Sequence, residues 1–434
     1  MSKNQRSITH RVTVYTKAFF RNYPALPSVL KWLCISAVVG GLVGTASAGF
    51  LVSLEWATQT RESHLWLIAL LPVGGFLIGL LYHYFGKEVE AGNNMLIDEI
   101  NGPTKVIPFK MAPFVYIGTV ATHLFGGSAG REGTALQMAG SIADQLSKPF
   151  KLDKDDRSIL LIAAVAAGFG SVFGTPLAGA LFGLEFFLIG RIRYHAIFPA
   201  FCAAILADLV TSSWHVPHTQ YHIPVVPELA SLPVLYCVAA GVAFGLCAAT
   251  FSKMMRATGT LFKSNIHFPP LRPLVGGVIV ALAVLAVGTT KYIGLGIPTI
   301  VQSFGEQLPP YDFLLKLVFT VVTLSAGFKG GEVTPLFFIG AALGNALSFF
   351  IPLPVGLLAG MGFVAVFAGA TNTPLACTLM GIELFGGECG IYVALACVVA
   401  YLFSGHNGIY GKQRIGEPKH RRFTHHLNKA ISNL

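Results

Sequence analysis

Apolar stretches separated by short polar or glycine-rich breaks recur along almost the whole chain. A helix that crosses a bilayer needs roughly 20 apolar residues, and several stretches are shorter than that or contain Gly and Pro. Short, interrupted helices are tolerated at membrane depth only where they are buried in protein or line a polar cavity. We therefore expect about ten to twelve helical segments, some of which do not cross the membrane. The clearest apolar stretches are 32–54, 65–81, 111–124, 159–189, 196–210, 232–250, 274–287, 313–326, 336–350, 354–370 and 391–403.

Composition strengthens the membrane interpretation. Of the 434 residues, 53% are hydrophobic and 12% are charged, about half the charged fraction of an average soluble protein. The 48 glycines suit transmembrane helices that pack closely against one another. The expected fold class is therefore an all-α polytopic membrane protein. Seven cysteines lie scattered without the spacing of a metal site or a disulfide framework, so we expect no metal and no cofactor.

Basic residues flank the apolar region at both ends. By the positive-inside rule, we expect a multi-pass protein of the cell membrane with both termini in the cytoplasm. A nucleic-acid partner is not expected, because the position of the basic tail next to the membrane accounts for it through topology and lipid contact. No cleavable signal peptide is expected, since about 30 mostly non-apolar residues precede the first stretch. The basic residues are Lys3, Arg6, Arg11, Lys17, Arg21 and Lys31 before the apolar region, and Lys412, Arg414, Lys419, Arg421, Arg422 and Lys429 after it.

Two pairs of segments repeat in the same order. Residues 130–140 share Gly, Glu, Thr, Leu and a final Gly with residues 330–340, without a gap. Residues 175–187 parallel 373–385 in the same way, and every one of these segments carries a Glu inside apolar sequence. Collinear matches of this kind indicate duplication, and broken segments in corresponding halves point to a binding site at the membrane midplane. We predict a cytoplasmic N-terminal segment (1–29), a first repeat (30–213), a linker (214–230), a second repeat (231–404) and a C-terminal segment (405–434).

The matched segments predict two helix starts that face an anion. Glycine-rich stretches at 126–130 and 327–331 cannot easily continue a helix, so helices should begin near 132–135 and 332–335. The first turn of a helix presents unpaired N–H groups and the positive end of the dipole, which favours anion binding. Two such starts converging from two repeats would hold a dehydrated anion. The expected contacts are Gly130, Gly133, Thr134, Val333 and Thr334, with the two threonines adding hydroxyl donors.

Glu132 and Glu332 lie where the anion is expected, although a charged side chain in a membrane is costly. One interpretation is that each glutamate merely caps its own helix. The functional interpretation is that Glu132 imitates the anion: ionised, it occupies the site, and protonated, it leaves. Proton and anion then compete for one place, which couples their movements.

At these residues the chain resembles the CLC family of anion channels and anion/proton antiporters. Two segments show the resemblance: Gly130–Thr134 is similar to that family's gating-glutamate motif, and Thr175–Glu185 is similar to the helix that follows it. The resemblance covers about residues 30–415. It implies a CLC-type inverted repeat of tilted and partly spanning helices, assembled as a homodimer with one pathway in each subunit.

Four departures from the chloride-handling pattern resemble the fluoride-exporting subgroup of that family. Thr134 replaces Pro, residues 92–96 replace a Gly-Ser-Gly-Ile-Pro loop, residues 331–335 replace Gly-Ile-Phe-Ala-Pro, and Glu185-Phe186 lacks a paired Glu that relays protons. The resemblance implies that Asn93 selects the ion, that Glu332 is a second proton-coupling glutamate, and that Phe338 and Tyr410 line the path.

The function expected from these observations is fluoride/proton antiport that exports fluoride, with Glu132 as gating and proton-coupling carboxylate. Fluoride is strongly hydrated, and an Asn amide offers N–H donors that replace lost water. The alternative is a chloride/proton exchanger or chloride channel of the same fold. An intramembrane enzyme is not expected, because no recognised catalytic motif accompanies the glutamates. The expected partners are fluoride and protons, chloride as a further candidate anion, a second copy of the chain, and the lipid bilayer.

Other polar residues receive simpler interpretations. We expect Glu185 and Glu383 to accept hydrogen bonds from backbone in the helix packing, and His123 to be a satisfied packing residue. Asp98, Glu99 and the charge cluster 151–157 are expected to be solvated. Lys329 either stabilises an ionised Glu332 or faces water at a helix end, and Arg131 is assigned no ion contact.

Overall fold

The computed structural model describes residues 25–434, and their structure is mostly helical. The predicted N-terminal segment therefore lies outside the described residues, apart from its last few positions. The first eight helices are α2 (Leu26–Ser63), α3 (Leu71–Phe85), α4 (Asn93–Asn101), α5 (Met111–Leu124), α6 (Glu132–Asp144), α7 (Lys154–Phe173), α8 (Pro176–Glu185) and α9 (Ile197–Ser213). The next eight are α10 (Ser231–Asn265), α11 (Leu271–Val287), α12 (Ile297–Gln302), α13 (Asp312–Ser325), α14 (Val333–Leu347), α15 (Val355–Thr371), α16 (Pro374–Phe385) and α17 (Gly390–Phe403).

Short elements complete the chain. Two-residue strands β1 (Leu188–Ile189) and β2 (Arg414–Ile415) pair in parallel and fasten the C-terminal segment to the end of the α8 region. The 3₁₀ turns are η1 (Leu65–Leu70), η2 (Lys87–Val89), η3 (Gln145–Ser147), η4 (Tyr194–Ala196), η5 (Gly387–Cys389), η6 (Arg421–His426) and η7 (Ile431–Asn433).

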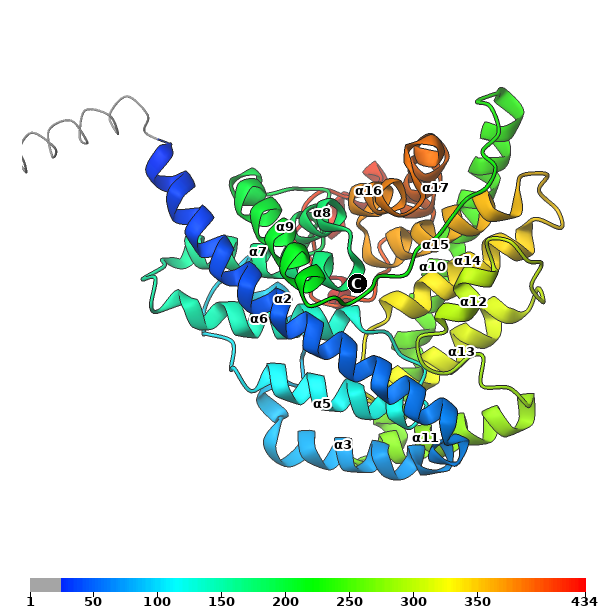
Figure 1. Cartoon of the computed structure of the whole chain (residues 1–434), viewed down its shortest axis with the longest axis horizontal. Helices are drawn as coiled ribbons and strands as arrows, with labels where there is room; N and C mark the ends of the chain where they lie inside the picture. The colour runs from blue at the N-terminus through cyan, green and yellow to red at the C-terminus, as the bar shows by residue number, and fades with distance from the viewer. Residues whose placement is uncertain (1–24) are drawn as a thin grey trace, which may run out of the picture.

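Helix lengths fit a bilayer crossed by tilted and partial spans. Among the described residues, five helical stretches are long and apolar enough to cross a membrane, and further apolar helices of 10–17 residues are shorter. The 38 residues of α2 extend about 57 Å at 1.5 Å per residue, nearly twice the roughly 30 Å hydrocarbon core. A helix of that length must therefore lie tilted, and in Figure 1 α2 runs diagonally across the molecule.

The two sets of helices lie side by side, with α2 to α9 on one side of Figure 1 and α10 to α17 mainly on the other. A core of phenylalanine rings joins them: Phe182 stacks on Phe169 with centroids 4.3 Å apart and on Phe367 at 5.7 Å. Phe337 stacks on Phe363 at 4.0 Å. Because these rings come from α7, α8, α14 and α15, burial of aromatic surface holds the two sets together.

Glu185 and Glu383 cap each other's helices across the two sets. Glu383 of α16 accepts N–H bonds from Leu177 and Ala178 at the start of α8, at 3.0 and 2.7 Å. Glu185 of α8 accepts N–H bonds from Leu375 and Ala376 at the start of α16, at 3.2 and 2.8 Å. The expectation that both carboxylates bond backbone is confirmed. Each places negative charge at the positive end of a helix dipole, which stabilises the packing.

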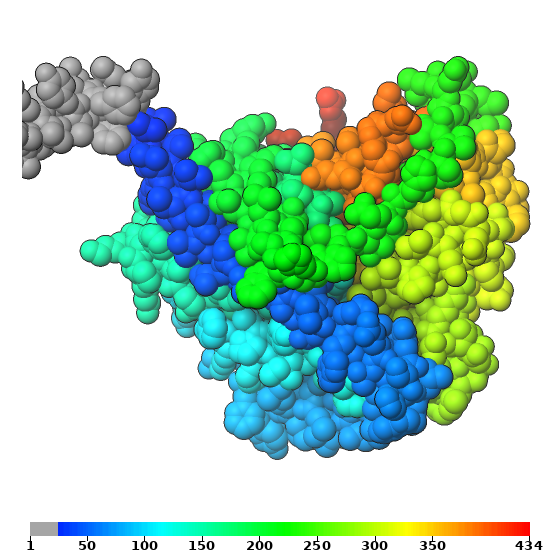
Figure 2. All heavy atoms as spheres, in the orientation of Figure 1, coloured from blue at the N-terminus to red at the C-terminus, as the bar shows by residue number. Residues whose placement is uncertain are grey.

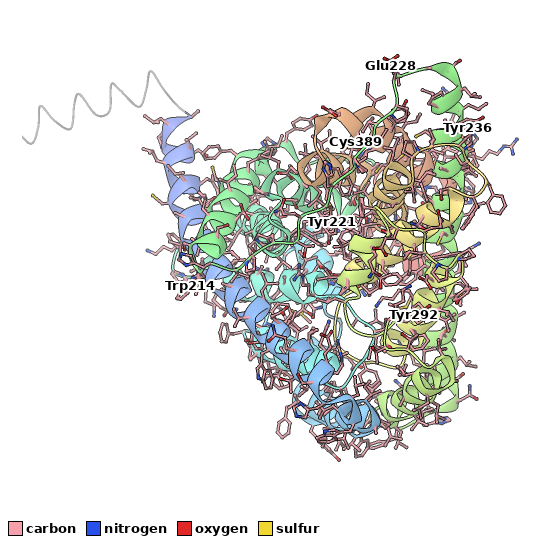
Figure 3. The ribbon with its side chains drawn as sticks, turned by 45° about the vertical axis from the view of Figure 1, so that its right-hand side comes forward. Trp214, Tyr221, Glu228, Tyr236, Tyr292 and Cys389 are labelled. Atoms are coloured by element: carbon pink, nitrogen blue, oxygen red, sulfur yellow. The ribbon has the colours of Figure 1, made fainter. Side chains whose placement is uncertain are left out.

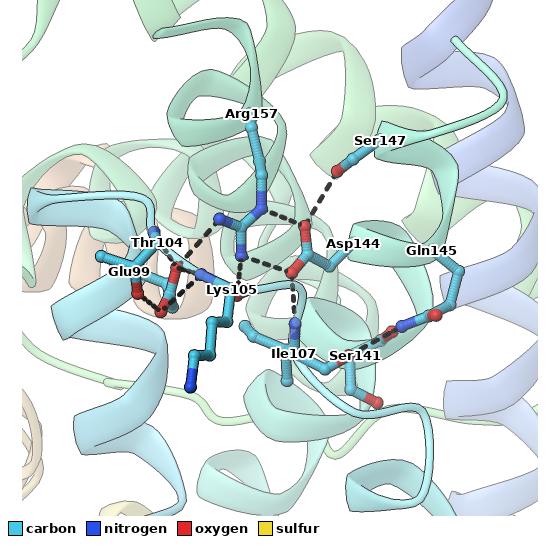
Figure 4. Close-up of polar contacts among 9 residues, drawn as sticks. All are labelled: Glu99, Thr104, Lys105, Ile107, Ser141, Asp144, Gln145, Ser147 and Arg157. Atoms are coloured by element: carbon cyan, nitrogen blue, oxygen red, sulfur yellow. Dashed lines mark hydrogen bonds and ion pairs between the residues drawn. The ribbon is translucent and has the colours of Figure 1, made fainter. Parts of the chain in front are cut away.

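The prediction that Glu99 and the 151–157 cluster are solvated is wrong for Glu99 and Arg157. Arg157 is 7% exposed and donates to Glu99 at 2.9 Å and to both oxygens of Asp144 at 2.7 and 2.8 Å. Figure 4 shows the Arg157 guanidinium between the two carboxylates. The partners come from α4 and from the C-terminal end of α6, which a polar stretch of sequence does not reveal. Asp98 has a 43% exposed side chain, as expected for a solvated residue.

Removing this buried cation is expected to destabilise the fold. Arg157→Met leaves two buried carboxylates without their partner, which lowers the free energy of unfolding by about 3–5 kcal/mol. The temperature at which the detergent-solubilised protein loses its monodisperse gel-filtration peak measures the effect. Lys110→Met is the control, because Lys110 pairs with the exposed Glu88 at 2.8 Å and its loss should leave that temperature unchanged. Equal temperatures for both variants would contradict the account.

Candidate functional site

Two glycine-rich turns meet at the centre of the molecule. The Gly130 N–H donates to the Gly331 carbonyl at 2.6 Å, and the Gly331 N–H donates to the Gly130 carbonyl at 2.8 Å. A Cβ on Gly331 would lie 2.6 Å from the Gly133 nitrogen, so only glycine allows this approach. Helix α6 begins at Glu132 and α14 at Val333, which agrees with the predicted starts. The first turns of the two helices therefore lie side by side.

The Glu132 carboxylate is fully buried and binds the start of the other helix. It accepts the Thr334 N–H at 3.1 Å and the Thr334 hydroxyl at 2.5 Å. A further bond comes from the N–H of Arg131 at 3.2 Å, and the Arg131 Nε lies 3.6 Å away. The carboxylate thus takes the donors at the start of α14, in addition to the backbone donor of the residue that precedes it. Val333, at that start, is fully buried.

Asn93 and Glu332 approach the same point beside Gly133. An added Cβ on Gly133 would lie 3.1 Å from the Asn93 Nδ2 and 3.8 Å from the Glu332 Oε2. Asn93 is the first residue of α4, and its buried Oδ1 has no hydrogen-bond partner. The Tyr410 hydroxyl is likewise buried without a partner. Asn93, Glu332 and Tyr410 all line one cavity of about 210 Å³, next to the C-terminal segment.

Thr134, Phe338 and Lys329, which the sequence analysis singled out, each have neighbours other than Glu132 and Glu332. The Thr134 hydroxyl pairs with that of Thr119 at 2.7 Å. Phe338 is 1% exposed and is not among the residues that line the 210 Å³ cavity. Its ring lies 5.3 Å from the Lys316 ammonium and 6.4 Å from the Tyr292 ring. Lys329 lines that cavity with its ammonium 3.8 Å from the Tyr82 ring, and no ion pair joins it to Glu332 within residues 25–434.

A second cavity, of about 560 Å³, lies next to the C-terminal end of α2. Arg131 and Gly296 form part of its wall, and a Cβ on Gly296 would lie 2.6 Å from the Phe338 ring. Arg131 contacts Glu132, whereas the first cavity reaches Glu332 and Gly330. The two cavities thus have different walls: one includes Arg131, next to Glu132, and the other includes Gly330 and Glu332.

The sequence interpretation missed two buried cations near this site. Lys316 of α13 has no exposed surface and donates to the carbonyls of Tyr292 and Gly294 at 3.2 and 2.7 Å. Arg61 is also buried and donates to the His123 carbonyl at 3.0 Å. A signal existed for Lys316, because a Lys inside an apolar stretch is a default candidate for function, whereas Arg61 lies in a polar stretch, 58–64, that gives no such signal. His123 bonds the Thr119 and Ala129 carbonyls at 2.9 and 3.1 Å, which confirms it as a satisfied packing residue.

Comparisons with known proteins bear on the family and the fold of the chain. A family model described as "Voltage gated chloride channel" matches residues 74–405. The chain is 56% identical over 403 residues to a "Chloride/fluoride channel protein" of Pseudomonas syringae pv. tomato, covering 92% of this chain and 89% of that one. A solved structure of a CLC-type fluoride/proton antiporter superposes with a TM-score of 0.87 at 35% identity, covering 91% of this chain and 99% of that one. A slow cyanobacterial Cl⁻/H⁺ antiporter matches in fold, with a TM-score of 0.73 at 21% identity over 86% and 94% of the two chains. The expected fold class is confirmed.

Proposed function

The chain belongs to the CLC family, a family of multi-pass membrane proteins that move anions, and on this basis we propose that it is a fluoride/proton antiporter. In this proposal it exports fluoride across the cell membrane while protons enter. The observation that carries the proposal is the Glu132 carboxylate, which occupies the N–H and hydroxyl donors of Thr334. Two of the relatives are named for fluoride, which supports the choice of ion.

Competition for these donors provides the coupling. Ionised Glu132 holds two donors of α14 that would otherwise bind an anion, and charge-assisted bonds are roughly twice as strong as neutral ones. Protonation removes the charge, weakens both bonds and frees the carboxyl group to leave. A fluoride ion then takes the same donors, so each ligand lowers the occupancy of the other.

Asn93 supplies the selection for fluoride. Its Nδ2 lies beside Gly133, the residue that follows Glu132, and carries two N–H groups. Fluoride loses strong bonds to water on entering, and only firm N–H and O–H donors compensate for that loss. The unpaired Tyr410 hydroxyl offers one further donor at the wall of the same cavity.

Glu332 is the second proton-coupling residue in this scheme. Its carboxylate approaches Gly133 on one side and lines the 210 Å³ cavity on the other. A proton that Glu132 has received passes to Glu332 and from there to water in that cavity. With both termini in the cytoplasm, the cavity beside Tyr410 opens to the cytoplasm and the 560 Å³ cavity opens to the outside. Each subunit of a homodimer would contain one such pathway.

Chloride is the second candidate anion, because the relative from Pseudomonas is named for chloride as well as fluoride. Efflux from proteoliposomes loaded with either anion, with the anion and pH recorded together, separates the alternatives. We expect fluoride to leave at least about tenfold faster than chloride, since one hydrogen bond to a charged group contributes about 1.5–3 kcal/mol. Equal rates for the two anions would overturn the assignment to fluoride. Fluoride efflux without proton movement would indicate a channel rather than an antiporter.

A further inference from the structure

The linker between α9 and α10 runs across one end of the central site as an extended strap, defined here as residues 214–230. Figure 3 shows it passing from Trp214 by way of Tyr221 to Glu228, and in Figure 2 its green atoms lie on the surface. Tyr221 anchors it, with its ring 5.2 Å from that of Phe363 and 5.6 Å from that of Phe304. The strap is therefore held against the second set of helices, and it carries His218 just before this anchor.

Unpaired polar atoms gather around His218. In residues 25–434, eight buried side-chain nitrogen or oxygen atoms have no hydrogen-bond partner, and four of them belong to His218, Asp208 and Arg131. The His218 Nε2 lies 3.9 Å from the Asp208 Oδ1. A Cβ on Gly174 would lie 2.7 Å from the His218 ring, so this glycine, at φ +70°, admits the imidazole. Buried polar atoms in native proteins are nearly always paired, so such a cluster indicates groups that meet water or ions.

His218 and Arg131 both line the 560 Å³ cavity, which greatly exceeds the about 30 Å³ that one water occupies. The charged groups facing this space are Glu55, Arg61 and Glu62 of α2, Arg131 before α6 and Lys291, while Asp208 of α9 approaches His218. Among these side chains, histidine alone ordinarily titrates near neutral pH. Burial and, to a lesser extent, the charge of Arg131 lower the pKa of His218, while the nearby Val172 backbone raises it less; the net lowering makes the protonated form a ready donor.

We propose that His218, oriented by Asp208, relays protons from the 560 Å³ cavity to Glu132. This inference rests on the proposed antiport, in which protons must reach Glu132 from the outside. The imidazolium gives one of its two N–H protons to cavity water, that water gives a proton to the Glu132 carboxylate beside Arg131, and the neutral imidazole takes a proton from outside water. No bond other than those to the transferred protons forms or breaks. Asp208 stabilises the charged imidazolium, and Arg131 favours its release of the proton.

The test is fluoride efflux from intact cells that express His218→Gln, measured with the medium at about pH 5.5 and about pH 7.5, a range over which histidine side chains change their charge. At the lower pH, protons reach Glu132 directly and the variant should match the unmodified protein. At the higher pH it should be slower by roughly tenfold, less than the about hundredfold typical of a lost direct proton donor, because water still enters the cavity. Imidazole added to the medium should restore the rate. In the Asp208→Asn variant, fluoride efflux should begin to slow at a lower pH than in the unmodified protein as the pH of the medium rises. The reason is that loss of a neighbouring carboxylate lowers the histidine pKa.

His222→Gln is the matched control, because this histidine lies on the same strap, is exposed and does not line the 560 Å³ cavity. It should keep the unmodified rate at both pH values. A His218→Gln variant with an unchanged pH profile, or one slowed equally at both pH values without rescue by imidazole, would overturn the relay. Absence of proton coupling in the unmodified protein would instead overturn the antiport itself, so the two failures are distinguishable.

Discussion

Replacing Glu132 by Gln is expected to abolish proton transport while fluoride still crosses the membrane. The amide has the shape of the protonated carboxyl group but cannot release a proton or carry a charge. It therefore cannot compete with fluoride for the donors of Thr334, which hold the carboxylate at 3.1 and 2.5 Å. Proton flux in proteoliposomes should fall by about 10²-fold or more, the loss that accompanies removal of a group that transfers protons.

Glu55→Gln is the matched control for this result. Glu55 lines the 560 Å³ cavity but is exposed, and it accepts a hydrogen bond from the nearby Gln59. Its neutralisation should leave the ratio of fluoride to proton flux as it is in the unmodified protein. If Glu132→Gln also kept that ratio, the gating role of Glu132 would be refuted.

The second large effect is expected from Asn93→Ser, which should reduce the preference for fluoride over chloride. The substitution replaces two N–H donors beside Gly133 with one shorter hydroxyl. A hydrogen bond to a charged group contributes about 1.5–3 kcal/mol, so the ratio of fluoride to chloride efflux should fall by roughly 10- to 150-fold. Initial rates from liposomes loaded with one anion at a time measure this ratio.

Asn94→Ser provides a control one position along the chain. The Asn94 side chain accepts the N–H of Lys412 at 3.0 Å, so its role is to hold the C-terminal segment. The efflux ratio should stay at the unmodified value in this variant. Loss of selectivity in Asn94→Ser, or its retention in Asn93→Ser, would remove the basis for assigning selection to Asn93.

The sequence predicted the broken helices because their signals are local. Glycine-rich breaks followed by apolar runs placed the starts of α6 and α14 correctly, and the matched repeats suggested that these starts converge. The apolar stretch 159–189 was less informative, because it is divided into α7 and α8 by Gly174, at φ +70°, followed closely by Pro176. Helix α10 ends at Asn265, beyond the predicted 250, because its residues 251–265 mix polar with apolar side chains and so do not continue the apolar stretch.

Contacts between distant residues were the part that sequence could not supply. Glu132 binds Thr334 across 202 positions, and nothing local shows that the carboxylate reaches the other repeat rather than its own helix. The burial of Arg157 likewise depends on Glu99, 58 positions away. His218 lies in a polar linker of the kind that usually faces water, so only the folded chain brings it to Asp208 and the cavity wall.

The most direct test of the antiport is the direction in which protons move when fluoride alone provides the driving force. Liposomes loaded with fluoride, with equal pH on both sides and the membrane voltage clamped by potassium and valinomycin, should take up protons as fluoride leaves. The external medium should become more alkaline, and this change should be absent in Glu132→Gln. Fluoride efflux with no change in external pH, or with acidification as expected for escape of neutral HF, would contradict the account.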